Sequence, residues 1–408
     1  MQFPQGKNMT RVKASNQSAI LRTIYYYGPV NRSEIAQRVD LTLPAVTTNI
    51  NKMLENGLVK EVFVQGRAFN SSGRHAHPLE INPEAFYFGG VEMRGNDLSV
   101  CVTNFCGEIL ASADSVLENG TYENFVRQIA DLFVGCLAKS GKKPDDLSGI
   151  GISMPGLVDR ENGILKINTR FQWINKKVCH DFSRLAGYRG KITLENNVIA
   201  RGMSAQLFHW KEIENVKSFA YLLVSVGIAC PLFLNTFSYR GSVVEAGEVG
   251  HMVIEPHGRR CNCGKRGCLE TYASEYAIIN DCREKMRQGH AAVLRELCAD
   301  AESPEIAEII RAQEIGDPDV CRIMENAVYM LSIAVTNIIN FTNPDIMLID
   351  SLLFKNENNR KLLLEYIQTS LYEAAYFKTN FSFVEPDRLV GALGAAAIAI
   401  DESLEIVV

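Results

Sequence analysis

Four side chains of the kinds that bind transition metals occur within 18 residues of this 408-residue chain. His251 is followed by Cys261, Cys263 and Cys268, and glycines between the cysteines allow the chain to turn. Thiolate and imidazole donors suit Zn²⁺, and four protein ligands complete its tetrahedral coordination, leaving no position for a substrate. The spacing therefore predicts one structural zinc ion, with an iron–sulfur centre, a redox disulfide or plain buried cysteines as alternatives.

The other cysteines and the composition indicate where the protein works. Eight further cysteines are scattered along the chain and are expected to be core residues. An odd total of eleven, without an apolar N-terminal stretch suited to a signal sequence, indicates reduced thiols. Hydrophobic residues make up 47% and charged residues 22%, as in a folded globular protein, and no apolar run reaches the roughly 18 residues that cross a bilayer. We expect a cytoplasmic protein with no membrane partner.

Charge is distributed unevenly along the chain. Residues 1–80 hold ten Lys/Arg and five Asp/Glu, a net charge of +5, whereas the remaining 328 residues hold 32 and 42, a net charge of −10. A basic segment on an acidic body is expected where one domain meets a polyanion such as DNA and the other does not. A chance excess of five charges is the alternative, and the residue pattern has to decide between them.

The basic segment predicts three helices and a hairpin. The elements are a helix over 17–26, a short helix with a capping box at Asn31 and Glu34, a helix over 43–55 capped by Thr42, and strands near 58–64 and 78–79. Gly28-Pro29 would stop the first helix, and Gly57 would end the third. This order is that of a winged helix-turn-helix.

The third predicted helix would enter the DNA major groove, which has room for one helix. Its outer face carries small or polar side chains that can approach base edges and phosphates, and Arg67, Arg74 and His75 would lie on or near the wing. The residues predicted to contact a double-stranded DNA operator are Arg32, Thr42, Ala45, Thr47, Thr48, Asn51, Lys52 and Arg74. A small helical domain with a solvated polar face is the alternative.

Several motifs of the body resemble those of one known family. Glu245-Ala-Gly-Glu-Val-Gly-His251, ten residues before Cys-x-Cys-x4-Cys-Leu-Glu270, resembles the signature of the ROK family (repressors, open reading frames and sugar kinases). Ser153-Met-Pro-Gly-Leu-Val-Asp159, Glu195-Asn-Asn197 and Gly391-Ala-Leu-Gly-Ala-Ala396 follow in the family's order. With its winged head, the chain is most similar to the repressor branch, of the N-acetylglucosamine/xylose repressor type.

This resemblance implies an α/β fold in three parts. A winged helix-turn-helix over 1–80 would precede a two-lobed, actin-like ATPase body with mixed sheets. Lobe 1 is predicted over 81–200 and lobe 2, with the zinc knuckle, over 201–408, and the C-terminal helix is expected to return to lobe 1.

The body departs from ROK kinases where the resemblance places ATP and proton transfer. Glu92, Arg94, Gly95 and Asn96 match the kinase motif Asp-x-Gly-Gly-Thr, Gly227 to Pro231 match the second phosphate loop, and Asp350-Ser351 replace a glycine pair beside adenosine. The bulky Arg94 and the donor-less Pro231 are poorly suited to cradling phosphate. The kinase general base is replaced by Asn197, whose amide cannot accept a proton from a sugar hydroxyl. We therefore expect no ATP cofactor and no enzyme activity.

The same resemblance implies a sugar between the lobes. The residues matching sugar-holding positions are Asn196, Asn197, Glu248, His251 and Glu270. Carboxylate and amide groups suit a sugar because each can bond to adjacent hydroxyls. His251 would bind zinc through one ring nitrogen and a hydroxyl through the other, so that the metal fixes the pocket's geometry. A pocket that binds nothing is the alternative.

Together these features predict a sugar-responsive DNA-binding transcriptional regulator, a repressor of carbohydrate-metabolism genes with an inactive kinase-like sensor. Its partners would be an operator, a sugar or sugar-phosphate effector, and further copies of itself in a homodimer or dimer of dimers. Two alternatives remain. One is a ROK sugar kinase with degraded ATP motifs, and the other is a regulator controlled by a partner protein instead of a sugar.

Overall fold

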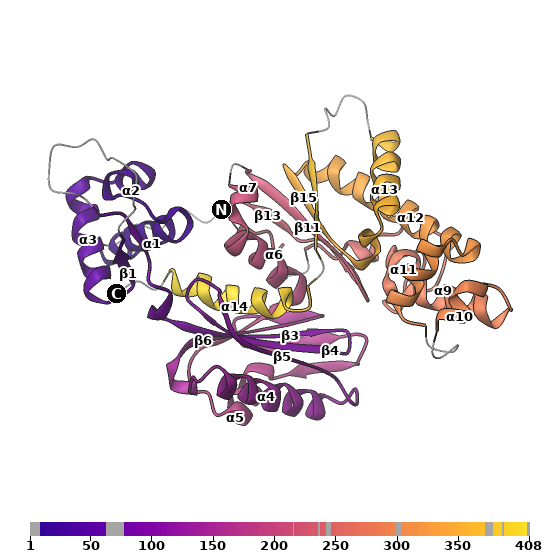
Figure 1. Ribbon diagram of the computed structural model, residues 1–408, viewed down its shortest axis with the longest axis horizontal. Coiled ribbons are helices and arrows are strands. Elements are labelled where there is room, and N and C mark those ends of the chain that lie inside the picture. Colours follow the sequence, from indigo (N-terminus) through magenta and orange to yellow (C-terminus); the bar gives the residue numbers. More distant parts are fainter. Residues whose placement is uncertain are drawn as a thin grey trace.

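A small helical head is joined to a body of two lobes in the computed structural model (Figure 1). The structure describes residues 9–62, 77–214, 216–235, 237–241, 246–298, 304–371, 378–385 and 387–405. Within these ranges no helix combines the length and the apolar character needed to traverse a bilayer.

The head has the elements that its sequence predicts. They are α1 (Met9–Tyr27), α2 (Arg32–Val39), α3 (Leu43–Glu55), β1 (Val59–Glu61) and β2 (Leu79–Ile81), with β1 and β2 antiparallel. The backbone N–H of Asn31 donates to Glu34 Oε2 at 3.1 Å, as in a capping box, and Gly57 has the left-handed φ of 68° that ends α3. Thr42 precedes α3, but its side chain makes no capping hydrogen bond. The first helix begins well before residue 17, because no Gly or Pro interrupts residues 9–16.

Lobe 1 is built on a five-stranded mixed sheet. Its order is β10 (Ile192–Asn196), β6 (Leu147–Met154), β3 (Tyr87–Arg94), β4 (Asp97–Asn104) and β5 (Ile109–Val116). One face is covered by α4 (Tyr122–Lys139) and α5 (Val178–Ala186), and the other by α14 (Val390–Ser403) (Figure 1). A small antiparallel sheet of β7 (Leu157–Asp159), β8 (Ile164–Asn168) and β9 (Trp173–Lys176) lies beyond β10.

The C-terminal helix α14 lies directly on the strand backbones of lobe 1. A Cβ atom at Gly90 would overlap the carbonyl of Ala392, and one at Gly151 would overlap that of Ala395. Glycine is therefore required at both strand positions, because any larger residue would force α14 off the sheet.

Lobe 2 is built on a second mixed sheet. Its order is β14 (Phe237–Ser238), β13 (Leu232–Leu234), β11 (Ser218–Val224), β15 (Ile346–Asp350) and β16 (Asn380–Val384), with β12 (Ile228–Ala229) also paired to β11. The helices on its outer face are α8 (Glu270–Ala273), α9 (Glu275–Arg287), α10 (Ala292–Leu297), α11 (Ile306–Ile315), α12 (Pro318–Thr342) and α13 (Glu357–Ser370). Short 3₁₀ turns are η1 (Pro83–Ala85), η2 (Pro144–Asp146), η3 (Val249–His251) and η4 (Leu352–Lys355).

Two elements join the three parts of the molecule. Helix α6 (Asn197–Phe208), followed by α7 (Trp210–Ile213), packs against α14 and contacts strands of both sheets. At the head, the rings of Tyr26 and Tyr27 contact Trp210 of α7, with centroids 5.6 and 4.7 Å apart. The predicted boundaries at residues 80 and 200 fall inside β2 and α6, so the division into domains stays a prediction.

Candidate metal centre and interlobe site

The four predicted metal ligands meet at one point of lobe 2. The ligand atoms of His251, Cys261, Cys263 and Cys268 all lie within 4.8 Å of one another. The Sγ atoms of Cys263 and Cys268 are 3.6 Å apart, and the Sγ atom of Cys261 is 3.7 Å from His251 Nδ1. Three thiols and an imidazole at this separation fit the donor set of a closed tetrahedral zinc site.

Backbone hydrogen bonds shape the turn that carries the cysteines. The Cys261 N–H donates to the Lys265 carbonyl at 2.8 Å, and the Gly264 N–H donates to the Cys261 carbonyl at 3.0 Å. Gly267 has a φ of 75°, and a Cβ atom there would overlap the carbonyl of Glu255. The tight turn therefore needs glycine at 267, as the sequence suggests.

One predicted sugar-binding residue stands beside the metal cluster. Glu270, the first residue of α8, places Oε1 3.1 Å from Cys261 Sγ and 3.6 Å from His251 Nδ1. The Nδ1 atom of His251 therefore faces both the thiols and this carboxylate. Glu248, just before η3, is solvent-exposed.

The two predicted sugar-binding asparagines lie at the start of α6. Asn196 uses both ends of its amide within the protein: Oδ1 accepts from the Val198 N–H at 2.9 Å, and Nδ2 donates to the Gly156 carbonyl at 3.3 Å. Asn197 is the first residue of the helix and is buried. These two hydrogen bonds hold the Asn196 amide in a fixed orientation. A sugar hydroxyl that bonds to Asn196 would therefore have to compete with the helix cap.

A buried group of charges lies where the two lobes meet, and sequence reasoning missed it. Arg201 of α6 donates through Nε and Nη2 to the carboxylate of Glu92 on β3, at 2.9 and 3.0 Å. Its Nη1 donates to Asp350 Oδ2 on β15 at 2.7 Å, and the Tyr221 hydroxyl donates to the same oxygen at 2.8 Å. Burial alone would lower the pKa of Arg201, but the two carboxylates raise it, so the guanidinium stays charged.

This group of Arg201, Glu92 and Asp350 joins two segments that the resemblance to ROK kinases places at different parts of an ATP site. Glu92 lies in the segment that the resemblance matches with the first phosphate loop, and Asp350 lies in the segment that it matches with the glycine pair beside adenosine. The signal available in the sequence was an arginine inside the apolar stretch Val198–Met203, since a buried arginine requires carboxylate partners.

The two neighbouring segments that the resemblance matches with the kinase phosphate loops also approach each other. A Cβ atom at Gly95 would lie 3.1 Å from Val226 Cγ2, so the turns of the two lobes nearly touch.

Burial raises the pKa of Glu275 to about 7, although Arg94 and a 3.3 Å hydrogen bond from Ser225 lower it. The Oε1 atom of Glu275 is buried and has no hydrogen-bond partner.

Of the predicted DNA-contacting residues that the structure describes, Arg32 begins α2 and the others lie on or directly before α3. Thr42, Thr48, Asn51 and Lys52 are exposed, and Ala45 and Thr47 are half-buried. The hydroxyls of Thr47 and Thr48 donate to carbonyls four residues earlier, at 2.8 and 2.9 Å, which leaves their oxygens free to accept. Arg32 pairs with Glu61 of β1 at 2.9 Å. Arg67, Arg74 and His75 lie outside the described residues.

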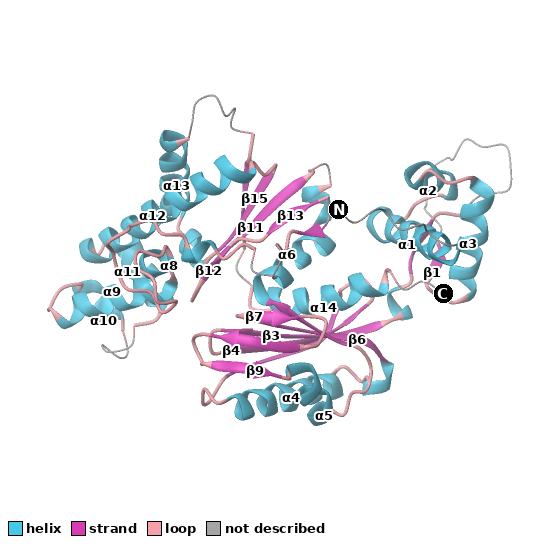
Figure 2. Cartoon of the chain, turned by 180° about the vertical axis from the view of Figure 1, so that it is seen from behind, coloured by secondary structure: helices cyan, strands magenta, loops and turns pink. Residues whose placement is uncertain are grey.

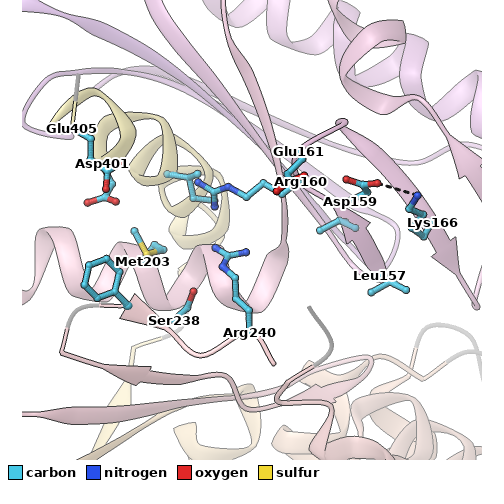
Figure 3. Close-up of a pocket in the computed structure, with 13 residues that line it drawn as sticks. Leu157, Asp159, Arg160, Glu161, Lys166, Met203, Ser238, Arg240, Asp401 and Glu405 are labelled. Atoms are coloured by element: carbon cyan, nitrogen blue, oxygen red, sulfur yellow. Dashed lines mark ion pairs between the residues drawn. The ribbon is translucent and has the colours of Figure 1, made fainter. Parts of the chain in front are cut away.

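A cavity of about 780 Å³ opens between the lobes near the head (Figure 3). Its walls come from β7, α6, β14 and α14, and Arg160 and Arg240 extend toward one another at its centre. None of the residues predicted to bind the sugar lines this cavity.

Comparison with known proteins identifies the family of this chain. The model of the ROK family matches residues 88–402, and that of the MarR family matches residues 14–61. The chain belongs to the ROK family. The fold class predicted from the sequence, a helix-turn-helix head on a two-lobed body with mixed sheets, is thereby confirmed.

Relatives of this ROK protein match over nearly its full length. A xylose repressor of Bacillus subtilis (strain 168) is 25% identical over 405 residues, covering 98% of each chain. The DNA-binding transcriptional dual regulator NagC of Escherichia coli (strain K12) is 25% identical, covering 93% of this chain and 90% of its own. The crystal structure of a ROK family transcriptional regulator, a homologue of the E. coli Mlc protein, matches with a TM-score of 0.79 and 22% identity over 97% of each chain, which shows a shared fold.

Proposed function

We propose that this ROK protein is a sugar-responsive DNA-binding transcriptional regulator, a repressor of carbohydrate-metabolism genes. The observation that carries the proposal is the joining of two parts in one chain: a helix-turn-helix head whose α3 presents exposed Thr48, Asn51 and Lys52, and a ROK body. Relatives named as repressors, which match both parts together, support it.

The body is proposed to sense a sugar without phosphorylating it. Asn197, in place of the kinase base, can hydrogen-bond to a hydroxyl but cannot remove its proton. The buried group of Arg201, Glu92 and Asp350 supports the loss of ATP binding, because protein side chains fill the junction between the first phosphate-loop strand and β15. Asn196, Asn197, Glu248, His251 and Glu270 remain the proposed sugar contacts.

We further propose that His251, Cys261, Cys263 and Cys268 hold one structural zinc ion. When bound, the ion would cross-link η3 to the cysteine turn and so fix His251 and Glu270 relative to each other. The proposed regulatory mechanism needs a homodimer, in which the two bodies set the spacing of two heads on a pseudo-palindromic operator. A sugar that binds one lobe arrangement more tightly would shift that spacing.

The test is a DNA selection followed by a sugar titration. Duplexes retained by the full-length protein from a random pool are sequenced, and the affinity for the enriched duplex is measured by fluorescence anisotropy. D-xylose, N-acetylglucosamine and N-acetylglucosamine 6-phosphate are then added separately. We expect one of them to weaken DNA binding by about 5- to 150-fold, the usual range of allosteric coupling.

Two variants and a kinase assay complete the test. Lys52→Ala should weaken binding to the enriched duplex, whereas Lys361→Ala, an exposed lysine of α13, should not. No phosphate should pass from ATP to any of the sugars. Failure to enrich any duplex would overturn the proposal, and phosphate transfer would establish the kinase. DNA binding that no sugar changes would favour a partner protein as the signal.

A further inference from the structure

A series of ion pairs, completed by the neighbouring residues Asp401 and Glu402 of α14, connects lobe 2 with the head beside the interlobe cavity. We propose that this series, Arg240–Glu195–Arg160–Glu402 and then Asp401–Arg22, transmits a displacement of lobe 2 to the DNA-binding head. These residues position other groups and do not themselves bind a ligand. The inference rests on the proposed function, in which a change in the body alters DNA binding by the head. Figure 3 shows Arg160 and Arg240 at the centre of the cavity and Asp401 beside it.

The first half of the series connects the two lobes. Arg240, two residues after β14 of lobe 2, places Nη2 2.7 Å from Glu195 Oε2. Arg160, which follows β7 of lobe 1, places Nη1 2.6 Å from the same oxygen. Glu195 lies on β10 and is completely buried, so its carboxylate depends on these two guanidiniums for compensation.

The second half connects lobe 1 to the head. Arg160 also places Nη2 2.7 Å from Glu402 of α14, so a single guanidinium is shared between two carboxylates. The adjacent residue, Asp401, pairs with Arg22 of α1 at 2.5 Å, and Arg22 Nη2 donates to the Asp401 carbonyl at 3.2 Å. Because Asp401 and Glu402 belong to one helical turn, they move together.

Because Arg160 is shared between Glu195 and Glu402, a movement of Arg240 should change how firmly Glu402 is held. If lobe 2 draws Arg240 away, the buried Glu195 keeps only Arg160 and attracts it more strongly. Arg160 then holds Glu402 less firmly, which loosens one of the contacts that fix the end of α14 beside Arg22. Lys191, at 2.9 Å, and Thr193, at 2.8 Å, still bind Glu402 in that state, so its charge stays compensated.

The cavity supplies the space that such a movement needs. A close-packed interior would resist displacement of long side chains, whereas about 780 Å³ of open volume lies against both arginines. The Nη1 atom of Arg240 is buried without a hydrogen-bond partner, so one end of this guanidinium is not tied to the protein. The edge-to-face contacts of Tyr26 and Tyr27 with Trp210 offer a second route to the head, and the experiment has to separate the two routes.

The experiment measures hydrogen exchange in α1 of the full-length protein and needs neither sugar nor DNA. We compare Arg240→Ala with Arg388→Ala, which removes an exposed arginine 3.8 Å from Asp114. We expect Arg240→Ala to speed exchange in α1 by about 2- to 30-fold, the range for mutations along a coupling route, and Arg388→Ala to leave it unchanged. Arg240→Lys, which keeps the charge, should restore most of the protection.

Repeating the comparison in a Glu402→Gln background shows whether the effect passes through the ion pairs or through the aromatic contacts with Trp210. Glu402→Gln removes the charge that Arg160 shares, so adding Arg240→Ala to it should speed α1 exchange no further. The inference is overturned if Arg240→Ala leaves α1 unchanged, if its effect persists in full in the Glu402→Gln background, or if exchange rises equally in β6, which would show general loss of stability. These outcomes are distinct from a failure to bind DNA or sugar, which would overturn the proposed function.

Discussion

Replacing Arg201 with methionine should destabilise the protein severely. Arg201 is 1% exposed and compensates two carboxylates, those of Glu92 and Asp350, which are themselves buried. Methionine fills a similar volume but removes the cation from both carboxylates, so that Asp350 keeps only its hydrogen bond from the Tyr221 hydroxyl. Removing one member of a buried charge group costs about 3–5 kcal/mol, and this could be half or more of the stability of a typical domain.

The assay is urea unfolding followed by tryptophan fluorescence, since Trp173 lies in lobe 1 and Trp210 beside the head. The midpoint of the unfolding transition and its dependence on urea concentration together give the free energy of unfolding of the wild type and of the variant.

Two further variants test the physical reason. In Glu92→Gln/Arg201→Met/Asp350→Asn no charge is left to desolvate, so at least half of the lost stability should return. Arg311→Met removes an exposed arginine from a helical pair with Glu314 and should change stability by less than about 0.5 kcal/mol. A loss below about 1 kcal/mol for Arg201→Met, or no recovery in the triple variant, would refute the reasoning.

Three other predictions follow from single sites. Cys263→Ser should lower bound zinc, measured by elemental analysis, and destabilise lobe 2; full zinc content would contradict the proposed ligand set. Since the pKa of Glu275 is raised to about 7, the wild type should lose up to about 3 kcal/mol as the pH rises from about 4.5 to about 7, and a Glu275→Gln variant that keeps this slope would disprove the assignment. Gly151→Ala should lower the melting temperature because its Cβ would overlap the Ala395 carbonyl, whereas Gly135→Ala, in open space on α4, should raise it slightly.

The sequence predicted those features that depend on residues close together in the chain. Apolar periodicity and the capping pair Asn31 and Glu34 gave the helices of the head, and α3 has the predicted bounds. The metal cluster could likewise be predicted, because its four ligands lie within one short segment.

The features that it missed are assembled from distant segments. The group around Arg201 joins β3, α6 and β15, and nothing in the local pattern of any one segment specifies the other two. Asn196 could be assigned to a sugar by resemblance, but its use as a helix cap depends on where α6 begins. The ion pairs beside the cavity were invisible for the same reason, since Arg22 and Asp401 are 379 residues apart.

The seating of α14 on lobe 1 has a consequence for how the protein is made. The sheet of lobe 1 is synthesised early, but the helix that covers one of its faces comes from residues 390–403. The last strand of this sheet ends at Asn196 and α14 begins at Val390, 194 residues later (390 − 196), so at about 5–20 residues per second roughly 10 to 40 s separate the two. During that interval the nascent lobe exposes glycine-lined strands with no cover, and a ribosome-bound chaperone or a premature stop near the 3′ end of the message would act on this surface first.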